Sequence, residues 1–372
     1  MGKLSNHLLK PLKWLFVICF YLLILGLILS YLSPYISPKT AWWIQLFGLA
    51  YPVILLVTVI FALGLLFNNR KKALILWIVI LIGTPVHLRF FGTGMSQDKS
   101  SENANTIRVM SYNVRLFDMY KWVHKELPDS KNAFLNYFKA QAPDVLCLQE
   151  YIEDKRPTPH ISIRDIKKSG NFSHMMQTVT VQSKNVNFGL AIFSKYPIVN
   201  QGELKTSDSN MSCIYVDIVK KEDTIRIYNT HLQSIRFQQD EYSIFDENAP
   251  TTKTNSEKVY GLFSKLKNAY PERIDETKDI LEHTQTTEFP IIIAGDFNEP
   301  PLSYIYGQFN NSFKDAFRET SFGIGKTYAG KIPAGRIDYI FYNDQLNALN
   351  FQRQREIISD HYAIWSELEI VE

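Results

Sequence analysis

The sequence predicts an α/β fold that follows an N-terminal region of transmembrane helices. Long uncharged apolar runs fill most of residues 1–92, which is typical of membrane-spanning segments. After residue 106, short β-branched apolar runs recur, and several of them end at a polar side chain. A helical pattern over residues 132–141 lies between two such runs, at 107–114 and 144–148. This succession of strand, helix and strand predicts a layered α/β domain.

The charged residues divide the chain in the same way. Residues 1–97 contain no acidic residue and 8 of the 40 basic ones, which leaves 32 basic side chains against all 37 acidic ones. The second part is therefore net acidic, although the whole chain carries a charge of +3. A net-acidic region disfavours a tight, non-specific DNA binder, but it leaves room for a local basic groove.

Three apolar runs, at about residues 14–33, 41–67 and 73–91, predict transmembrane helices. Basic residues cluster before the first run and again at Arg70–Lys72, so the positive-inside rule places both of these segments in the cytoplasm. Three spans then carry the rest of the chain across a bacterial inner membrane into the periplasm. If the short third run does not span, the rest of the chain stays in the cytoplasm.

Beyond the membrane region, residues 93–106 are small and polar and predict a flexible linker to a domain at 107–372. Within that domain a hairpin is expected across Lys220–Asp223, and the polar segment 237–256 predicts a long loop. A helix is expected from Glu257 to about His283.

That helix is expected to break near Pro271 and to turn Val259, Leu262, Phe263 and Leu266 inward. Cys147 and Cys213 lie within predicted strands, and no zinc-type spacing surrounds them. Both are expected to be buried thiols, with a disulfide between them left open for an exported domain.

The domain is organised around the run Ile291–Ala294, which predicts a buried strand that stops at Gly295. Asp296 and Asn298 follow at positions i and i+2, so an extended chain would point both side chains the same way. A carboxylate beside an amide at a strand end is suited to a water or metal ion together with a phosphoryl oxygen. The structural alternative is a strand followed by an Asx-type turn.

Other predicted strands also end at, or contain, a polar side chain. Each of these residues has an ordinary explanation on its own, such as a loop acid, a capping histidine or a paired core carboxylate. Taken together they suit metal-assisted phosphoryl chemistry, because carboxylate and amide oxygens favour Mg²⁺ or Mn²⁺ over zinc. The full set of candidates is Asn113, Glu150, His231, Asp296, Asn298, Asp338, Asp360 and His361.

This series resembles the endonuclease/exonuclease/phosphatase superfamily, which includes DNase I-like nucleases, inositol polyphosphate phosphatases and neutral sphingomyelinases. The resemblance covers about residues 105–372 and implies a four-layer α/β sandwich of the DNase I-like type. The motifs occur in the family's order as Ser111-Tyr112-Asn113, Leu148-Gln149-Glu150, Asn229-Thr230-His231-Leu232, Gly295-Asp296-Phe297-Asn298, Arg336-Ile337-Asp338-Tyr339 and Ser359-Asp360-His361.

The resemblance also implies a role for each residue. Glu150 is implied as the main metal ligand, with Asn113 and Asp360 close to the ion. Asp296 would orient or deprotonate the attacking water, and Asn298 would hold a phosphoryl oxygen. His361, oriented by Asp338, would stabilise the charge of the transition state, and His231 would contact the phosphate or assist the leaving group.

Two departures from the family's patterns narrow these expectations. Arg115 stands where exonuclease III-like members carry an acidic residue, which puts a second metal position in doubt. Glu299-Pro300 and Ile337-Asp338-Tyr339 replace the arginine and the Cys-Asp-Arg sequence of inositol phosphatases, so an inositol 5-phosphatase is disfavoured.

We therefore expect a membrane-anchored, Mg²⁺-dependent phosphodiesterase or phosphatase, in which Mn²⁺ can substitute. A lipid or lipid-linked phosphoester is the favoured substrate, because it suits both the membrane anchor and the acidic domain. A membrane-tethered nuclease that acts on DNA or RNA is the alternative, and a non-catalytic membrane scaffold is the least favoured. The sequence allows no inference of a protein partner.

Overall fold

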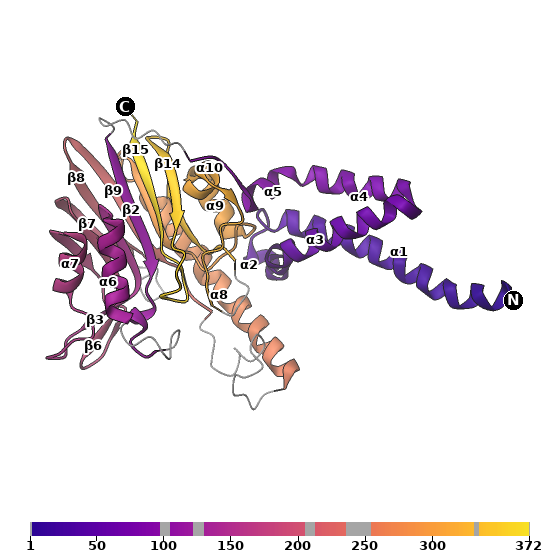
Figure 1. Ribbon diagram of the computed structural model, residues 1–372, viewed down its shortest axis with the longest axis horizontal. Helices are drawn as coiled ribbons and strands as arrows, with labels where there is room; N and C mark the ends of the chain where they lie inside the picture. The colour runs from indigo at the N-terminus through magenta and orange to yellow at the C-terminus, as the bar shows by residue number, and fades with distance from the viewer. Residues whose placement is uncertain are drawn as a thin grey trace. The chain divides into compact units, whose positions relative to one another are not determined.

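The computed structural model describes residues 2–96, 105–121, 130–204, 213–235, 254–330 and 335–371. Its internal contacts divide the chain into two compact units, one of Met1–Phe90 with Leu302–Gly307 and one of Phe91–Pro301 with Gln308–Glu372. Figure 1 follows the chain through both units by colour. Most of the predicted linker at 93–106 and of the predicted loop at 237–256 lies outside the described residues.

The first unit is made of apolar helices. Lys13–Leu32 and Pro38–Asn68 are long and apolar enough to cross a membrane, which agrees with the first two predicted spans. The region of the third predicted span is instead two helices bent by 59° at Gly83, which form one span only if they are taken together. The elements are α1 (Gly2–Leu32), α2 (Pro38–Ala41), η1 (Trp42–Ile44), α3 (Gln45–Asn68), α4 (Arg70–Ile82) and α5 (Thr84–Phe90).

The helices of this unit pack through a small apolar cluster that includes Phe20 of α1, Leu65 of α3 and Leu76 of α4. The Ser30 hydroxyl donates to the carbonyl oxygens of Gly26 (2.8 Å) and Phe47 (2.9 Å), which ties α1 to α3. Many outward side chains are large, apolar and exposed. Such a surface is suited to a hydrocarbon environment rather than to water.

The second unit is built on two large β-sheets in the described residues. One has the strand order β11-β13-β10-β9-β8-β7, and the other has the order β14-β15-β2-β3-β6-β4 with β5 paired to β6. A separate short pair joins β1 (Gly92–Thr93) to β12 (Phe322–Gly323). The sheet strands are β2 (Thr106–Asn113), β3 (Val145–Asp154), β4 (His174–Gln177), β5 (Val181–Gln182), β6 (Val186–Ser194), β7 (Ile198–Leu204), β8 (Cys213–Lys220), β9 (Asp223–His231), β10 (Ile291–Asp296), β11 (Lys314–Asp315), β13 (Asp338–Tyr342), β14 (Leu346–Arg353) and β15 (Ile364–Ile370).

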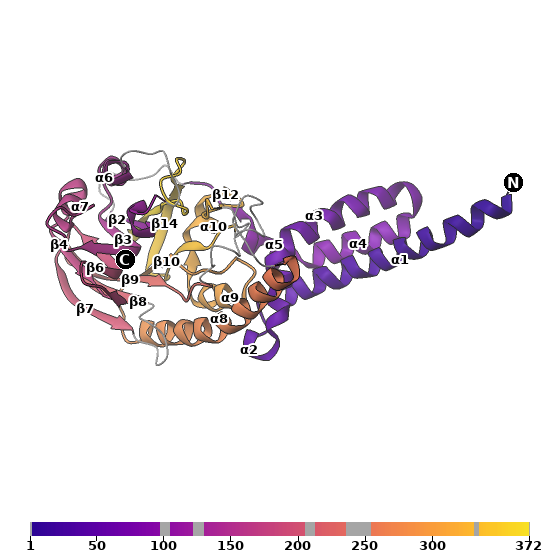
Figure 2. The same cartoon turned by 90° about the horizontal axis from the view of Figure 1, so that it is seen from below.

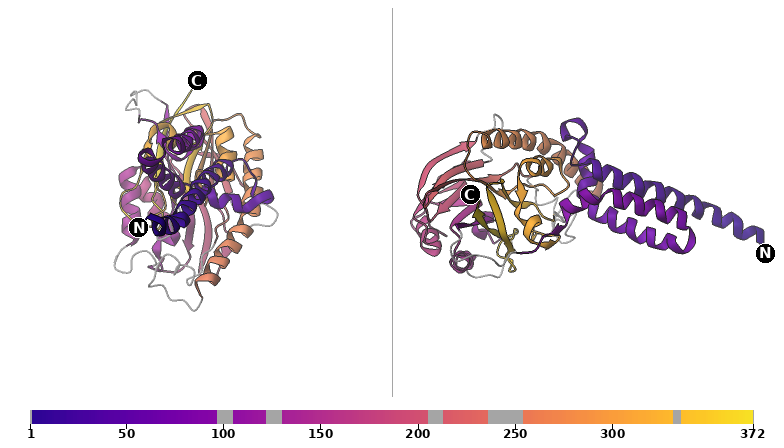
Figure 3. Two further views of the ribbon diagram at one scale, coloured as in Figure 1. Left: turned by 90° about the vertical axis from the view of Figure 1, so that its right-hand side faces the viewer. Right: turned by 90° about the horizontal axis from the view of Figure 1, so that it is seen from above.

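The two sheets pack face to face, and helices cover their outer faces. Val109 and Cys147 of one sheet and Ile227 and Ile292 of the other belong to a single fully buried cluster between the sheets. Figures 1 and 2 show α6 and α7 outside β3 and β6, and Figures 2 and 3 show α8 along the outer side of β8 and β9. The helices and the 3-10 turn of this unit are η2 (Arg115–Asp118), α6 (Ser130–Gln141), α7 (Ile163–Gly170), α8 (Asn255–Thr284), the part of α9 (Tyr304–Ser312) that follows Gly307, and α10 (Ala316–Thr320).

This order of helix, sheet, sheet and helix confirms the predicted four-layer α/β sandwich. The aliphatic side chains that face inward on both sheets are what hold the middle layers together, since apolar burial is the dominant favourable term in folding. The hairpin predicted across Lys220–Asp223 is present as β8 and β9. Cys147 and Cys213 are buried free thiols, and burial raises the pKa of each.

The prediction for the long helix is wrong in two respects. α8 continues through Pro271, although proline removes one helical hydrogen bond, because buried residues such as Leu266 and Ile280 pack on both sides of it. Val259 and Phe263 were expected to face inward, yet their exposed fractions are 41% and 39%. Leu266, which was also expected to face inward, is buried, so the prediction holds there and fails at the two residues nearer the N-terminus.

Candidate active site

Three neighbouring strands bring polar side chains to one edge of their sheet. β9 and β10 run parallel with His231 opposite Asp296, and β13 runs antiparallel to β10 with Asp338 opposite Asp296. The strand was predicted to stop at Gly295, but β10 continues through this residue to Asp296. A Cβ atom at Gly295 would lie only 2.0 Å from the backbone oxygen of Thr230, so only glycine allows the two strands to approach this closely.

Asp296 lies at the centre of the site, with 1% of its surface exposed. Its Oδ1 accepts the backbone N–H of Asn298 at 2.9 Å, which closes an Asx-type turn. Asn298 has a left-handed backbone, with φ of 53°, and its side chain donates to the Leu232 carbonyl at 2.9 Å. The two side chains are therefore not related as i and i+2 of an extended strand. The structural alternative, an Asx turn, is present and forms part of the polar cluster.

The second sheet contributes Asn113 and Glu150 to the same cluster. The Asn113 Nδ2 lies 3.1 Å from Asp296 Oδ2 and 3.2 Å from Glu150 Oε1, so one amide bridges carboxylates from both sheets. Glu150 was predicted to lie at the end of its strand, but β3 continues to Asp154. It occupies a bulge between Leu148 and Tyr151 with φ of 48°. Bulges of this kind redirect a side chain away from the regular sheet pattern.

Gln149 and Asn229 form a buried polar link beneath the cluster. The Gln149 Nε2 donates to Asn229 Oδ1 at 2.6 Å and to the Ser111 hydroxyl at 3.0 Å. The Asn229 Nδ2 donates in turn to the backbone oxygens of Leu148 and Ala191. Both residues lie inside the sequence motifs of the site, Gln149 next to Glu150 and Asn229 close to His231, but neither was predicted to have a role. Their positions inside apolar strands were the available signal, since buried amides require partners.

His361 is held by Asp338. Its Nδ1 lies 3.1 and 3.0 Å from the two carboxylate oxygens of Asp338, and its Nε2 lies 3.6 Å from Asp296 Oδ2. The Thr327 hydroxyl accepts the backbone N–H of Asp338 at 3.1 Å and so helps to hold that strand end. Burial alone would lower the pKa of His361, but the nearby carboxylates, chiefly that of Asp338, outweigh it and raise the pKa well above its ordinary value. Contact with these carboxylates therefore favours the protonated, positively charged form of the ring.

Asp360 is paired with Arg115. The guanidinium of Arg115 forms an ion pair with one carboxylate oxygen of Asp360, and the Ser359 hydroxyl contacts the other at 3.2 Å. The backbone N–H of Arg115 donates to Asn113 Oδ1 at 3.1 Å. Arg115 begins a turn whose four residues, through Asp118, all have positive φ. The sequence marked Arg115 only as a departure from the family, whereas the structure places it against one of the predicted metal ligands.

The donor set of this site fits a divalent cation. Ligand atoms of Asp296, Asp338 and His361, all buried, lie within 4.8 Å of one another, and with the His361 ring protonated the oxygen donors of this group are the two carboxylates. In the described part of the site, four carboxylates meet the positive charges of Arg115 and His361, which leaves an excess of two negative charges. The positive end of the Asn113 amide lies between Glu150 and Asp296, and it marks a position where a positive charge is favoured. Oxygen donors of this type suit hard cations.

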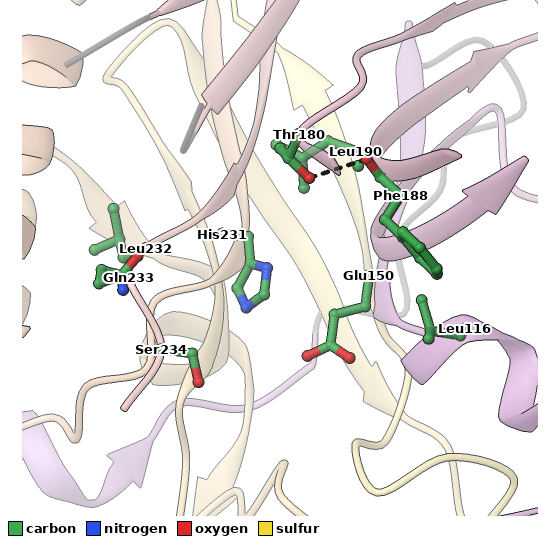
Figure 4. Close-up of a pocket in the computed structure, with 10 residues that line it drawn as sticks. Leu116, Glu150, Thr180, Phe188, Leu190, His231, Leu232, Gln233 and Ser234 are labelled. Atoms are coloured by element: carbon green, nitrogen blue, oxygen red, sulfur yellow. Dashed lines mark hydrogen bonds between the residues drawn. The ribbon is translucent and has the colours of Figure 1, made fainter. Parts of the chain in front are cut away.

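A cavity of about 250 Å³ opens beside this cluster. Figure 4 shows Glu150 and His231 pointing into the same space, with Leu116, Phe188 and Leu190 on one side. Leu232, Gln233, Ser234, Thr180 and Gly189 complete the lining, which contains no lysine or arginine among the described residues. His231 Nε2 also lies 3.6 Å from Asp296 Oδ2, so the cavity adjoins the carboxylate at the centre of the site.

The structure therefore brings all eight predicted site residues to one edge of the sandwich. Seven of them form one chain of contacts that runs through Asp296 and Asn113. Asp360 is connected to it by the Ser359 hydroxyl, which donates to the Asn113 carbonyl at 2.9 Å and contacts the Asp360 carboxylate. Their individual roles stay predictions.

Comparison with known proteins points to one family for most of the chain. Residues 110–361 match the Endonuclease/Exonuclease/phosphatase family, and residues 13–90 match a family described only as a domain of unknown function. Sphingomyelinase C of Bacillus cereus is 26% identical over 211 residues, which cover 51% of this chain and 61% of that protein. The match thus spans less than two thirds of the relative's length.

Two solved structures share the fold of the second unit. An endonuclease/exonuclease/phosphatase from Bacteroides vulgatus has a TM-score of 0.53 at 15% identity, and covers 72% of this chain and 99% of its own. A family protein from Bacteroides thetaiotaomicron has a TM-score of 0.51 at 15% identity, with coverage of 73% and 99%.

Proposed function

Since this chain belongs to the endonuclease/exonuclease/phosphatase family, we propose that it is a membrane-anchored, Mg²⁺-dependent hydrolase of phosphoester bonds. The family's name describes enzymes that act on such bonds, which agrees with the resemblance found in the sequence. In this proposal residues 1–92 anchor the protein, 93–106 link the two parts and 107–372 form the catalytic domain.

One observation carries the proposal. Asp296 accepts from Asn113 at 3.1 Å, and it lies 3.6 Å from the imidazole nitrogens of both His231 and His361. A buried carboxylate flanked by two imidazoles and an amide is costly to assemble unless a function requires it. Groups that bind a metal ion, a water molecule and a phosphoryl oxygen are thus gathered at one point.

The resemblance to the family assigns a role to each residue. Glu150, Asn113 and Asp360 would hold the cation, and Mn²⁺ is expected to substitute for Mg²⁺. The bound cation supplies Lewis acidity toward a phosphoryl oxygen.

Asp296 and Asn298 act on the water and the phosphate. Asp296 orients the attacking water and accepts its proton, while the turn closed by Asn298 keeps both residues in place. Asn298 holds a phosphoryl oxygen through the part of its amide not engaged by Leu232. His361, charged and fixed by Asp338, neutralises the charge that develops on the phosphorus centre, and His231 contacts the phosphate or the leaving oxygen.

A lipid or lipid-linked phosphoester is the substrate class that these features favour. The second part of the chain is net acidic, the cavity beside Glu150 and His231 has an apolar side, and the first unit carries exposed apolar helices. A polyanionic nucleic acid usually requires a basic surface. The similarity to Sphingomyelinase C supports the same choice. A nuclease is the alternative, because the same catalytic groups cleave phosphodiesters of any origin, and a scaffold is the least favoured.

A substrate panel tests the proposal on the full chain in detergent. The four substrates are phospholipid vesicles, plasmid DNA, single-stranded RNA and a chromogenic phosphodiester. Each is incubated with Mg²⁺ or Mn²⁺, at roughly 1–10 equivalents of free cation per protein, and in a second reaction with EDTA in place of the cation. We expect phosphate ester cleavage in the vesicles that EDTA abolishes and Mg²⁺ or Mn²⁺ restores. Cleavage of DNA or RNA alone would establish the nuclease instead. A folded chain that cleaves none of the four would overturn the proposal.

We also propose that the catalytic domain lies outside the cytoplasm, which requires that α4 and α5 form one span. Arg70–Lys72 and the basic residues before the first span support this orientation. A β-lactamase or alkaline phosphatase fused after residue 105 is expected to be active, since both reporters require export. A cytoplasmic reporter that is active at the same position would place the domain on the other side of the membrane.

A further inference from the structure

Behind the active site, a buried arginine of α8 contacts both chain segments that leave it. Arg273 has 1% of its side chain exposed and forms an ion pair with Glu299, also buried, at 2.5 Å. Its Nε donates to the Gln233 carbonyl at 2.6 Å, and its Nη1 donates to the Asn298 carbonyl at 3.0 Å. One guanidinium thus joins two segments that are distant in sequence, at Gln233 and at Asn298–Glu299, as the planar fork of arginine allows.

The two carbonyls belong to the segments that carry candidate catalytic groups. Gln233 follows His231 by two residues, and Asn298 is itself a candidate. The strand pairing of β9 and β10 ends at His231 and Asp296, so no strand-pairing hydrogen bonds hold the two segments together beyond these residues. Two bonds continue the link between the segments, from the Leu232 N–H to the Asp296 carbonyl (3.0 Å) and from Asn298 Nδ2 to the Leu232 carbonyl (2.9 Å).

Two further contacts, one from α8 itself and one from β13, hold the same two segments. Glu276, one helical turn after Arg273 on α8, accepts the backbone N–H of Gln233 at 2.9 Å. The Tyr339 hydroxyl of β13 donates to the Glu299 carbonyl at 2.7 Å. Asn298 adopts a left-handed backbone, which asparagine tolerates better than most non-glycine residues. The carbonyl contact from Arg273 is one of the bonds that hold it.

We propose that Arg273, paired with Glu299, is a positioning residue that sets the orientation of Asn298 and His231 for hydrolysis. It touches neither substrate nor cation, and it acts through the backbone at Asn298 and Gln233. The pair thus makes α8 part of the catalytic apparatus rather than only a cover for the sheet. This inference rests on the proposed phosphoester hydrolysis for its kinetic readout, and it has a second readout that does not depend on activity.

The chain offers a matched control for this proposal. Arg226 and Asp217 form another buried arginine–carboxylate pair, with side-chain exposures of 7% and 3% and contacts of 2.7 and 2.8 Å. Arg226 is on β9 opposite Ile291, at the start of β10, whereas the site lies at the other end of the same strand. Five residues of strand, roughly 17 Å, separate this pair from His231.

The kinetic test compares Arg273→Lys and Glu299→Gln with Arg226→Lys in the full chain. Lysine keeps the charge of Arg273 but cannot reach three acceptors in one plane. We expect kcat to fall roughly 10- to 100-fold in Arg273→Lys with KM changed less than about threefold, because small misplacement of catalytic groups is costly. Glu299→Gln should shift kcat in the same direction, while Arg226→Lys keeps kcat near wild type even if its Tm falls equally. Equal kcat in all folded variants would overturn the proposal.

A double-mutant cycle asks whether Arg273 acts through Asn298. Asn298→Ala removes the group to be positioned, so adding Arg273→Lys should cost clearly less in kcat than it costs in the wild-type background. Full additivity of the two losses would show that Arg273 acts by another route and would overturn the mechanism stated here.

Hydrogen exchange supplies the readout that is independent of turnover. The backbone N–H groups of Leu232 and Asn298 are bonded within this arrangement, so they should exchange at least about tenfold faster in Arg273→Lys than in Arg226→Lys. If the wild type cleaves no phosphoester but these amides lose protection, the proposed function fails while the positioning contact stands. If Arg273→Lys does not fold, the exchange and kcat of Glu299→Gln decide the question.

Discussion

Replacing His361 by glutamine is expected to lower kcat for phosphoester hydrolysis by about 100- to 1,000-fold. Glutamine can still donate a hydrogen bond to Asp338, but it cannot carry the positive charge that the Asp338 pair maintains on the imidazole. That charge lies 3.6 Å from Asp296, the proposed acceptor of the water's proton, and so beside the phosphoryl oxygens that would gain negative charge during attack. Steady-state kinetics with saturating Mg²⁺ measures the loss, and KM is expected to change much less than kcat.

His283 provides the control for this substitution. Its ring is also partly buried and contacts the Tyr228 hydroxyl at 2.9 Å, but it lies on α8 against the outer face of the sheet. His283→Gln should therefore retain kcat within about twofold while it perturbs packing to a similar degree. A His361→Gln protein that is folded and retains wild-type kcat would exclude His361 from the chemistry.

Replacing Glu150 by glutamine is expected to raise the Mg²⁺ concentration needed for half-maximal activity by at least about 100-fold. Loss of a residue that only supports a metal ligand costs about 10- to 100-fold in affinity, so loss of a direct carboxylate ligand should cost at least the upper value. The effect is expected in a Mg²⁺ titration of activity and equally in calorimetric binding without substrate. Excess Mg²⁺ should restore part of the activity, because glutamine retains one oxygen donor.

Glu153 lies on the same strand and gives a matched comparison. Its carboxylate accepts from Asn187 Nδ2 at 2.7 Å, away from Asn113 and Asp296. Glu153→Gln should leave the Mg²⁺ requirement unchanged. If both variants require the same Mg²⁺ concentration as the wild type, the cation is not bound at Glu150, and the buried group of Asp296, Asp338 and His361 becomes the candidate in its place.

The family and the fold could be predicted because the signals are local and ordered. Each motif joins an apolar strand to a polar residue, and the carboxyl ends of parallel strands meet at one edge, so His231 and Asp296 could be grouped before the structure was known, whereas Asp338, at the start of an antiparallel strand, was grouped through the resemblance alone. The spacing of β-branched residues also indicates the strands locally, because one face of each strand is buried between the sheets.

What could not be predicted depends on contacts between distant parts of the chain. The bulge at Glu150 arises where a strand accommodates its neighbours, and no residue preference announces it, whereas the turn at Asn298 is one that asparagine favours. The continuity of α8 through Pro271 depends on packing that outweighs the local cost of proline. The contact of Arg273 with Glu299 joins residues 26 positions apart and left no pattern in the sequence.

The link between Ser359 and Asn113 has a consequence for the life of the protein in the cell. The two residues are 246 positions apart, and β15, which follows His361, pairs directly with β2, where Asn113 stands. A nascent chain emerging from the ribosome therefore has its first catalytic strand long before the residues that complete it. Hydrolytic activity appears only after nearly all of the chain has been synthesised and has joined its first and last strands.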